Sequence, residues 1–139
     1  MESKKHSEVL LTYKTSTIRK RELDNLQDGC WLNDQVINFY YEYLSHKFLF
    51  SRDDVLLLDP SSVAMFHFSQ NLEDTVEIFG PLHLERKQTV LMPVNDNSNK
   101  YAAGGGSHWA LLVYSSLVEG EEGGAGNQFT YIDLSLIHI

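Results

Sequence analysis

The chain has 139 residues, of which 42% are hydrophobic and 22% are charged, and its formal net charge at pH 7 is -8. This composition is typical of one compact globular domain and argues against a disordered or collagen-like chain. The basic residues form no stripe longer than Arg19-Lys20-Arg21, which argues against nucleic-acid binding and favours a protein or peptide partner. The alternative is that the negative net charge serves solubility alone.

The first segment, residues 1–8, is polar, and we expect it to be a flexible leader. The β-branched and aromatic residues of Val9–Tyr13 then predict a short strand. Its apolar part is too short for a signal peptide or a membrane span, and the sequence has no Asn-X-Ser/Thr sequon. The single cysteine, Cys30, cannot form an internal disulfide. We therefore expect a cytosolic or nuclear protein with no membrane association.

Residues 16–26 mix charged side chains with spaced apolar ones, and their pattern is ambiguous between helix and strand. From Asn33 the pattern becomes helical, with Asn33 or Asp34 as the N-cap. Further apolar residues at positions 39 and 41 predict a helix that is enclosed on most sides. The apolar residues that recur at spacings of three and four are Val36, Ile37, Tyr40, Tyr43, Leu44 and Phe48.

Two short helices and three strands are expected next. Pro60-Ser61-Ser62 marks a turn and a cap for a helix through Phe68, and residues 71–79 predict a second helix that stops at Gly80-Pro81. Residues 89–94 and 108–114 predict buried strands, the second too apolar to be exposed on either face. Residues 119–126 predict a solvated hairpin loop, and 129–133 the returning strand. Helices followed by strands indicate an α+β fold, without an internal repeat or a second domain.

The pattern that indicates chemistry is a histidine at the start of one strand and an aspartate at the end of the next. A tight hairpin would bring His108 and Asp133 side by side, because antiparallel neighbours lie roughly 5 Å apart. A carboxylate in that place fixes the tautomer of the imidazole, which is two thirds of a nucleophile, histidine and aspartate triad. The alternative is that both side chains simply face water.

Three motifs together resemble the ubiquitin-like protease family, also called sentrin-specific proteases. They are Trp-Leu-Asn-Asp at 31–34, Asn-Asp-Asn-Ser-Asn at 95–99, and Gly-Gly-Ser-His-Trp at 105–109. The resemblance runs from about Val9 to Asp133, and the second and third motifs point to the deneddylase branch. It implies a papain-like α+β fold and a cysteine peptidase that cleaves a ubiquitin-like modifier after its C-terminal Gly-Gly. No cofactor or metal is implied, and we expect a monomer.

The resemblance also assigns roles to single residues. It implies that His108 is the general base and that Asp133 orients it. It implies that Trp31 and Trp109 roof the narrow tunnel for the Gly-Gly tail, and that Asp34 contacts a basic residue of the modifier. The loop 95–106 resembles an element that moves over the bound tail. Each tryptophan and Asp34 also has a structural explanation: Trp31 as a hydrophobic staple, Asp34 as a partner of the helix dipole, and Trp109 as ordinary core.

The family's nucleophile is a cysteine downstream of the aspartate, preceded by a glutamine that supplies an oxyanion-hole donor. The sequence contains neither, and Cys30 does not match the family's cysteine. The tail 134–139 matches the translation of a sequencing adaptor, so we expect the protease domain to occupy 9–133 and to be incomplete and inactive here. SUMO is the alternative substrate. A modifier-binding module without activity, and a fragment that does not fold, are the alternative interpretations of the chain.

Overall fold

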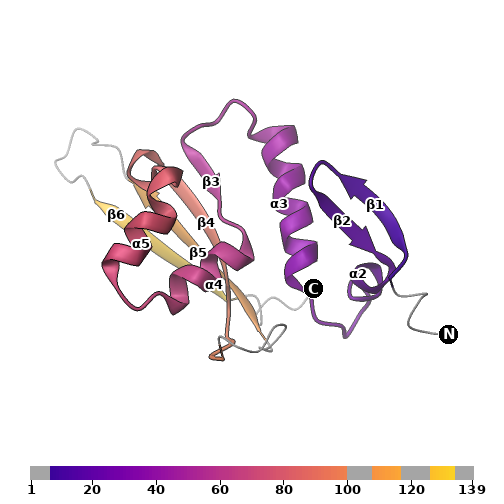
Figure 1. The fold of residues 1–139 in the computed structure, drawn as a ribbon. Helices are drawn as coiled ribbons and strands as arrows, with labels where there is room; N and C mark the ends of the chain where they lie inside the picture. The colour runs from indigo at the N-terminus through magenta and orange to yellow at the C-terminus, as the bar shows by residue number, and fades with distance from the viewer. Residues whose placement is uncertain (1–6, 100–107, 117–125, 134–139) are drawn as a thin grey trace.

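The computed structural model describes residues 7–99, 108–116 and 126–133, and Figure 1 shows how their elements are arranged. The predicted leader up to residue 6, the glycine-rich part of the loop, most of the hairpin loop at 119–126 and the tail 134–139 lie outside these residues. The elements in chain order are β1 (Val9–Tyr13), β2 (Ser16–Arg19), α2 (Lys20–Asp24), α3 (Asp34–Phe48), β3 (Val55–Leu57), α4 (Pro60–Phe68), α5 (Leu72–Phe79), the 3-10 helices η1 (Gly80–Leu82) and η2 (Leu84–Arg86), β4 (Thr89–Asn95), β5 (Trp109–Ser116) and β6 (Asn127–Asp133).

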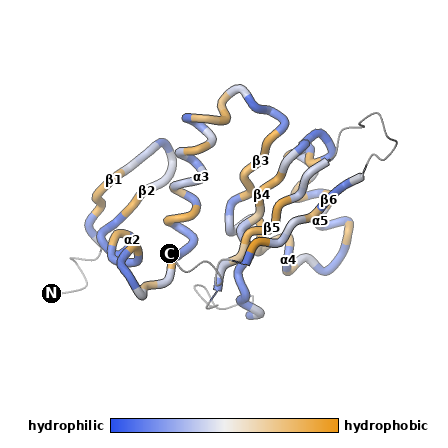
Figure 2. Tube along the Cα trace, turned by 180° about the vertical axis from the view of Figure 1, so that it is seen from behind, coloured by the Kyte–Doolittle hydropathy of each residue, from blue (hydrophilic) through white to orange (hydrophobic). Residues whose placement is uncertain are grey.

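The central sheet has four strands in the order β3-β4-β5-β6. β3 runs parallel to β4, and the two following pairs are antiparallel. Helices α4 and α5 cover one face of this sheet, and α3 lies between the sheet and the separate β1–β2 hairpin (Figures 1 and 2). In Figure 2, hydrophobic residues recur along β3, β4 and β5. The predicted α+β class is confirmed.

The core lies where α4 packs on the sheet. Its buried centre consists of Leu58, Val63 and Val90. α4 begins with Pro60 in its first turn, while Asp59 is the N-cap and its carboxylate accepts the Ser62 N–H at 3.0 Å. The half-buried side chains that surround this centre are Leu56, Leu82, Leu84, Met92, Val94 and Tyr114. This packing fixes β4 and so the strand that pairs with it, β5.

One glutamate of α3 fastens the β1–β2 hairpin to the helix. The carboxylate of Glu42 accepts the Thr15 N–H at 3.1 Å, the Thr15 hydroxyl at 2.6 Å and the Ser16 N–H at 2.8 Å. These groups follow Lys14, which has a φ of 52° in the tight turn. Burial raises the pKa of Glu42, but these hydrogen bonds outweigh it and lower the pKa to about 2.

The predicted strands and helices correspond to β1, α3, α4, α5, β4, β5 and β6, with small differences at their ends. Residues 16–26, whose pattern is ambiguous in the sequence, contain β2 and α2. The short strand β3 is not among the predicted elements. The enclosure of α3 is wrong for the described part of the chain. None of its residues is buried, and Tyr40 and Phe48 are 56% and 58% exposed. The β1–β2 hairpin and α4 cover only part of the surface of α3 (Figure 1).

No residue of β5 is exposed, as the sequence predicted, although only Ala110 is fully buried. In β4 the buried residues are Val90 and Pro93, and the other residues are half-buried rather than fully buried. Among the helices that the structure describes, none has both the length and the hydrophobicity needed to cross a bilayer.

Candidate active site

His108 and Asp133 are in contact where β5 begins and β6 ends. The strand register pairs Asp133 with Ala110, so His108, two residues before Ala110, is its diagonal neighbour on the same face. The distance between His108 Nε2 and Asp133 Oδ1 is 2.7 Å. The structure thus brings together the two residues that the sequence placed at adjacent strand ends.

The geometry assigns different tasks to the two ring nitrogens of His108. A carboxylate only accepts hydrogen bonds, so the neutral ring carries its proton on Nε2 and donates it to Asp133. Nδ1 then keeps a lone pair and is available to accept a proton. The side chains of His108 and Asp133 are 27% and 33% exposed, which leaves the pair accessible from outside. The arrangement is suited to general-base chemistry at Nδ1.

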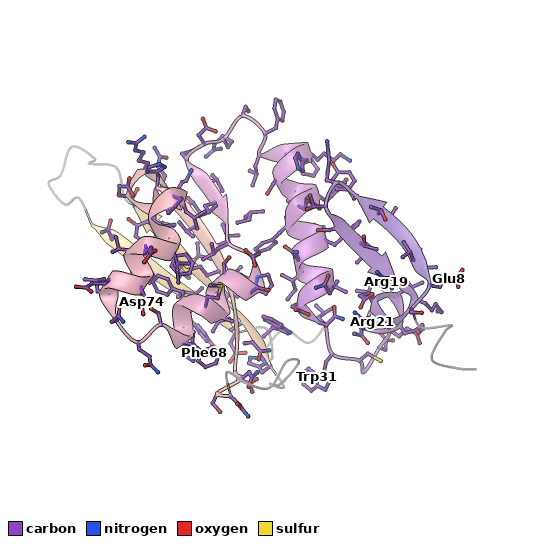
Figure 3. The ribbon with its side chains drawn as sticks, in the orientation of Figure 1. Glu8, Arg19, Arg21, Trp31, Phe68 and Asp74 are labelled. Atoms are coloured by element: carbon purple, nitrogen blue, oxygen red, sulfur yellow. The ribbon has the colours of Figure 1, made fainter. Side chains whose placement is uncertain are left out.

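A hydrogen bond connects Trp109 to the residue that follows Trp31. Trp109 Nε1 donates a hydrogen bond to the carbonyl oxygen of Leu32 at 2.8 Å, which attaches the start of β5 to the loop before α3. Trp31 lies on that loop and is 67% exposed (Figure 3). No ring contact joins the two indoles within the described residues. The tunnel roofed by Trp31 and Trp109 stays a prediction.

Two of the structural alternatives can be compared with this geometry. A hydrophobic staple uses the residue just before the N-cap, and because Asn33 is the N-cap, that residue is Leu32 and not Trp31. Trp109 is half-buried and its ring N–H is used to hold a loop, which differs from ordinary core packing. Asp34 is exposed in the first turn of α3, where it also interacts favourably with the helix dipole.

A buried carboxylate, that of Glu22, holds the loop before α3 through Asn33. Glu22 of α2 is 1% exposed and accepts the Arg19 N–H at 2.9 Å and the Asn33 side-chain amide at 3.4 Å. Burial raises the pKa of Glu22, but hydrogen bonds from Arg21, Arg19 and Asn33 and the charge of Arg21 outweigh it, so the pKa lies below its usual value. Because Asn33 caps α3 through the Val36 N–H, Glu22 ties α2 to the start of α3.

Cys30 is exposed in the loop before α3, and its thiol makes no hydrogen bond with His108 in the part of the chain that the structure describes. The same residues hold no group of three His, Cys, Asp or Glu side chains arranged to bind a metal ion. An open cavity of about 330 Å³ is lined by residues of α4, of α5 and of the turn between them, and none of the predicted site residues lines it. Its lining residues are Met65, Phe68, Ser69, Gln70, Asp74 and Ile78.

Sequence reasoning did not find two of the supporting residues. Glu22 occupies the third position of α2, and an N3 glutamate is a known signal for a helix start, but the preceding residue Arg19 is not a typical N-cap. In the sequence, Asp96 is only one polar residue of the loop 95–106, and its partner His108 across the sheet follows only from the strand register.

No family model matches the sequence. NEDD8-specific protease 1 of Arabidopsis thaliana is 38% identical over 105 residues, which cover 76% of this chain and 46% of that protein. Sentrin-specific protease 8 of Homo sapiens is 36% identical over 107 residues, which cover 76% of this chain and 50% of that protein. The chain therefore spans about half the length of the relatives it matches.

Solved structures give the same fold. A SUMO protease Ulp1 with its catalytic cysteine oxidised to a sulfenic acid matches 82% of this chain and 46% of its own, with a TM-score of 0.55 and 18% identity. A de-sumoylating protease matches 73% of this chain and 38% of its own, with a TM-score of 0.51 and 20% identity. At these identities the likeness shows the fold alone, and it confirms the predicted fold of the ubiquitin-like protease type.

Proposed function

The chain belongs to the ubiquitin-like protease family of cysteine peptidases, and from this premise we propose that it supplies the general base of an enzyme that cleaves a ubiquitin-like modifier after its C-terminal Gly-Gly. The observation that carries the proposal is the 2.7 Å contact between His108 Nε2 and Asp133 Oδ1. It leaves Nδ1 of the same ring available as a base beside a loop that presents an exposed indole, Trp31.

The proposed reaction follows from this arrangement. Nδ1 of His108 takes the proton of a cysteine thiol, and the thiolate attacks the carbonyl carbon of the modifier's last glycine. The imidazolium, stabilised by Asp133, gives its proton to the leaving amine as the amide bond breaks and a thioester forms. Water, deprotonated by the same ring, then hydrolyses the thioester and restores the thiol. Asp133 stays ionised and holds the ring in place throughout.

The nucleophile in this proposal is a cysteine outside the 139 residues. Cys30 is the chain's single cysteine, it is exposed, and its thiol does not hydrogen-bond with His108 within the described residues. The relatives are about twice as long as the region they share with this chain, which leaves room for a nucleophile elsewhere in such a protein. These 139 residues alone would then not hydrolyse a substrate.

The modifier we propose is NEDD8, both in its precursor form and attached to lysine side chains. The support is the names of the relatives, which include NEDD8-specific proteases at up to 38% identity. SUMO is the second candidate, supported by structural neighbours named SUMO proteases. Because those neighbours are only 18% identical, they carry less weight for substrate choice than the sequence relatives do.

Binding can be measured on the chain itself. Fluorescently labelled NEDD8 and SUMO are titrated separately with the purified chain, and with Trp31→Ala and Phe50→Ala variants. We expect NEDD8 to bind, with affinity lowered on the order of tenfold by Trp31→Ala, since exposed aromatic residues dominate protein interfaces. Phe50 is a matched control, because it is 79% exposed beyond the opposite end of the 15-residue helix α3.

The outcomes separate the candidate functions. If the chain binds SUMO more tightly than NEDD8, SUMO becomes the proposed substrate. If Trp31→Ala and Phe50→Ala lower the affinity for NEDD8 equally, Trp31 is not part of the proposed binding surface. Binding without hydrolysis by the protein that the complete gene encodes would leave the chain as a binding module, the alternative class of function.

A further inference from the structure

The backbone of His108 is held by one residue of the facing loop. Asp96 donates its backbone N–H to the His108 carbonyl oxygen at 3.2 Å, and the Asp96 carboxylate oxygen Oδ1 accepts the His108 N–H at 3.1 Å. We propose that Asp96 is a positioning residue, whose two hydrogen bonds hold His108 where its imidazole reaches Asp133. This inference rests on the proposed function of His108 as the base.

The position of Asp96 explains why its side chain is needed. The β4–β5 ladder ends at the pair of Asn95 and Trp109, so Asp96 and His108 would form the next pair. In a regular antiparallel ladder, every second pair of opposite residues exchanges two backbone N–H to carbonyl hydrogen bonds, and the bond from the Asp96 N–H to the His108 carbonyl oxygen puts these two residues at such a position. Here the bond from the His108 N–H goes to the Asp96 side chain instead. The carboxylate thus extends the pairing by one residue after the two backbones have begun to separate.

The neighbouring asparagines have a different role. The Asn95 side-chain oxygen accepts the Asn97 N–H at 2.9 Å, and the Asn97 side-chain oxygen accepts the Asn99 N–H at 2.9 Å. These are local turns of the kind that Asn side chains stabilise. Asp96, between them, reaches across to the other strand. Alternate residues of the Asn-Asp-Asn-Ser-Asn motif therefore shape the loop, while Asp96 connects it to His108.

The geometry of His108 depends on this connection. His108 precedes the first residue of β5, so the regular ladder does not fix its backbone. Asp133, in contrast, lies within β6 and is paired with Ala110. Without the two bonds to Asp96, His108 would be free to turn away from a fixed Asp133. The part of Asp96 that matters is its acceptor oxygen, and an asparagine there retains it.

The test is nuclear magnetic resonance of the 139-residue chain with Asp96→Ala, Asp96→Asn and Asn97→Ala. Two signals are followed: the downfield Nε2 proton that His108 shares with Asp133, and the exchange rate of the His108 amide. We expect Asp96→Ala to lose the Nε2 proton signal and to speed exchange on the order of tenfold. Asp96→Asn should keep both signals, and Asn97→Ala, which removes the acceptor of the Asn99 N–H, should leave them as in the unmodified chain.

The proposal is overturned if Asp96→Ala keeps the Nε2 signal at full intensity, or if a folded Asp96→Asn variant loses it. Should Asp96→Ala disrupt the sheet, as seen from the amides of Leu91 and Val113, which face each other in the β4–β5 ladder, the Asp96→Asn result decides alone. These signals report geometry and not catalysis. A negative result would therefore remove Asp96 from the account and leave the proposed function of His108 intact.

Discussion

Trp109 stabilises the molecule through one hydrogen bond that joins distant parts of the chain. Its Nε1 donates to the Leu32 carbonyl oxygen at 2.8 Å, so replacing it with phenylalanine removes the donor and keeps an aromatic ring. We expect Trp109→Phe to lower the free energy of unfolding by about 0.5–1.5 kcal/mol, measured by urea denaturation. Trp31→Phe is the control, and because Trp31 is 67% exposed, its effect should be close to zero. Equal effects of the two changes would argue against this role of Trp109.

At the residue level, the sequence could predict one contact of the candidate site and not the others. His108 and Asp133 belong to strands that follow each other in the chain, so a hairpin is enough to predict that they meet. Trp109 and Leu32 are 77 positions apart, and Glu22 and Asn33 lie on different helical segments. Such contacts depend on how the hairpin, α3 and the sheet pack, which local patterns do not specify. The roles assigned to His108, Asp133, Trp31, Trp109 and Asp34 stay predictions.

The attachment of the β1–β2 hairpin to α3 gives a dependence of stability on pH. The folded-state pKa of Glu42, about 2, lies below the ordinary value of 4.5, so Glu42 contributes stability that is fully present above about pH 4.5. That contribution is lost as the pH falls from 4.5 towards 2. We expect Glu42→Gln to reduce the free energy of unfolding at pH 7 by on the order of 1 kcal/mol, with the difference shrinking towards pH 2.

The measurement is urea denaturation of the unmodified chain and the Glu42→Gln variant at several pH values between 7 and 2. Glu77→Gln, a change at an exposed position of α5, serves as the control and should not show the same narrowing. A difference between the unmodified chain and Glu42→Gln that stays constant over this range would contradict the role of the Glu42 carboxylate.

Glu22 is expected to stabilise the start of α3 from α2. Replacing it with alanine leaves the Arg19 N–H and the Asn33 amide without this acceptor, and it opens space around a side chain that is 1% exposed. We expect Glu22→Ala to destabilise the chain by about 1–3 kcal/mol in thermal or urea unfolding. The tryptophan fluorescence should also change, because the loop before α3, which carries Trp31 and accepts the Trp109 hydrogen bond, loses a support. A variant as stable as the unmodified chain would show that the buried carboxylate is not needed.

Among the elements, local patterns predicted those with strong caps or long apolar runs. Asn33, Asp59 and Asn71 each accept a backbone N–H at the start of a helix, and all three helices were predicted. β3 has three residues, too few for a period to be recognised, and it is a strand because β4 lies beside it. Residues 16–26 contain a strand followed directly by a helix, so no single period describes them.

The whole molecule combines two parts that each support the candidate site. The sheet supplies His108 and Asp133 from β5 and β6, and the hairpin with α2 and α3 supplies the loop that carries Trp31. The bond between Trp109 and Leu32 joins these parts beside His108.

The sequence predicted the fold class but also predicted an enclosed α3. Its error arose because apolar periodicity shows which residues can be buried, and only packing shows which of them are.

The most direct test of the central claim is hydrolysis of NEDD8 that carries a fluorogenic amine on its C-terminal glycine, by the protein that the complete gene encodes. We expect release of the fluorophore, and a rate that is lower by about 100-fold or more for His108→Ala, because a positioned general base contributes roughly 10²–10⁴-fold. Full activity of His108→Ala would contradict the account, as would no hydrolysis by the unmodified protein under conditions in which it binds NEDD8.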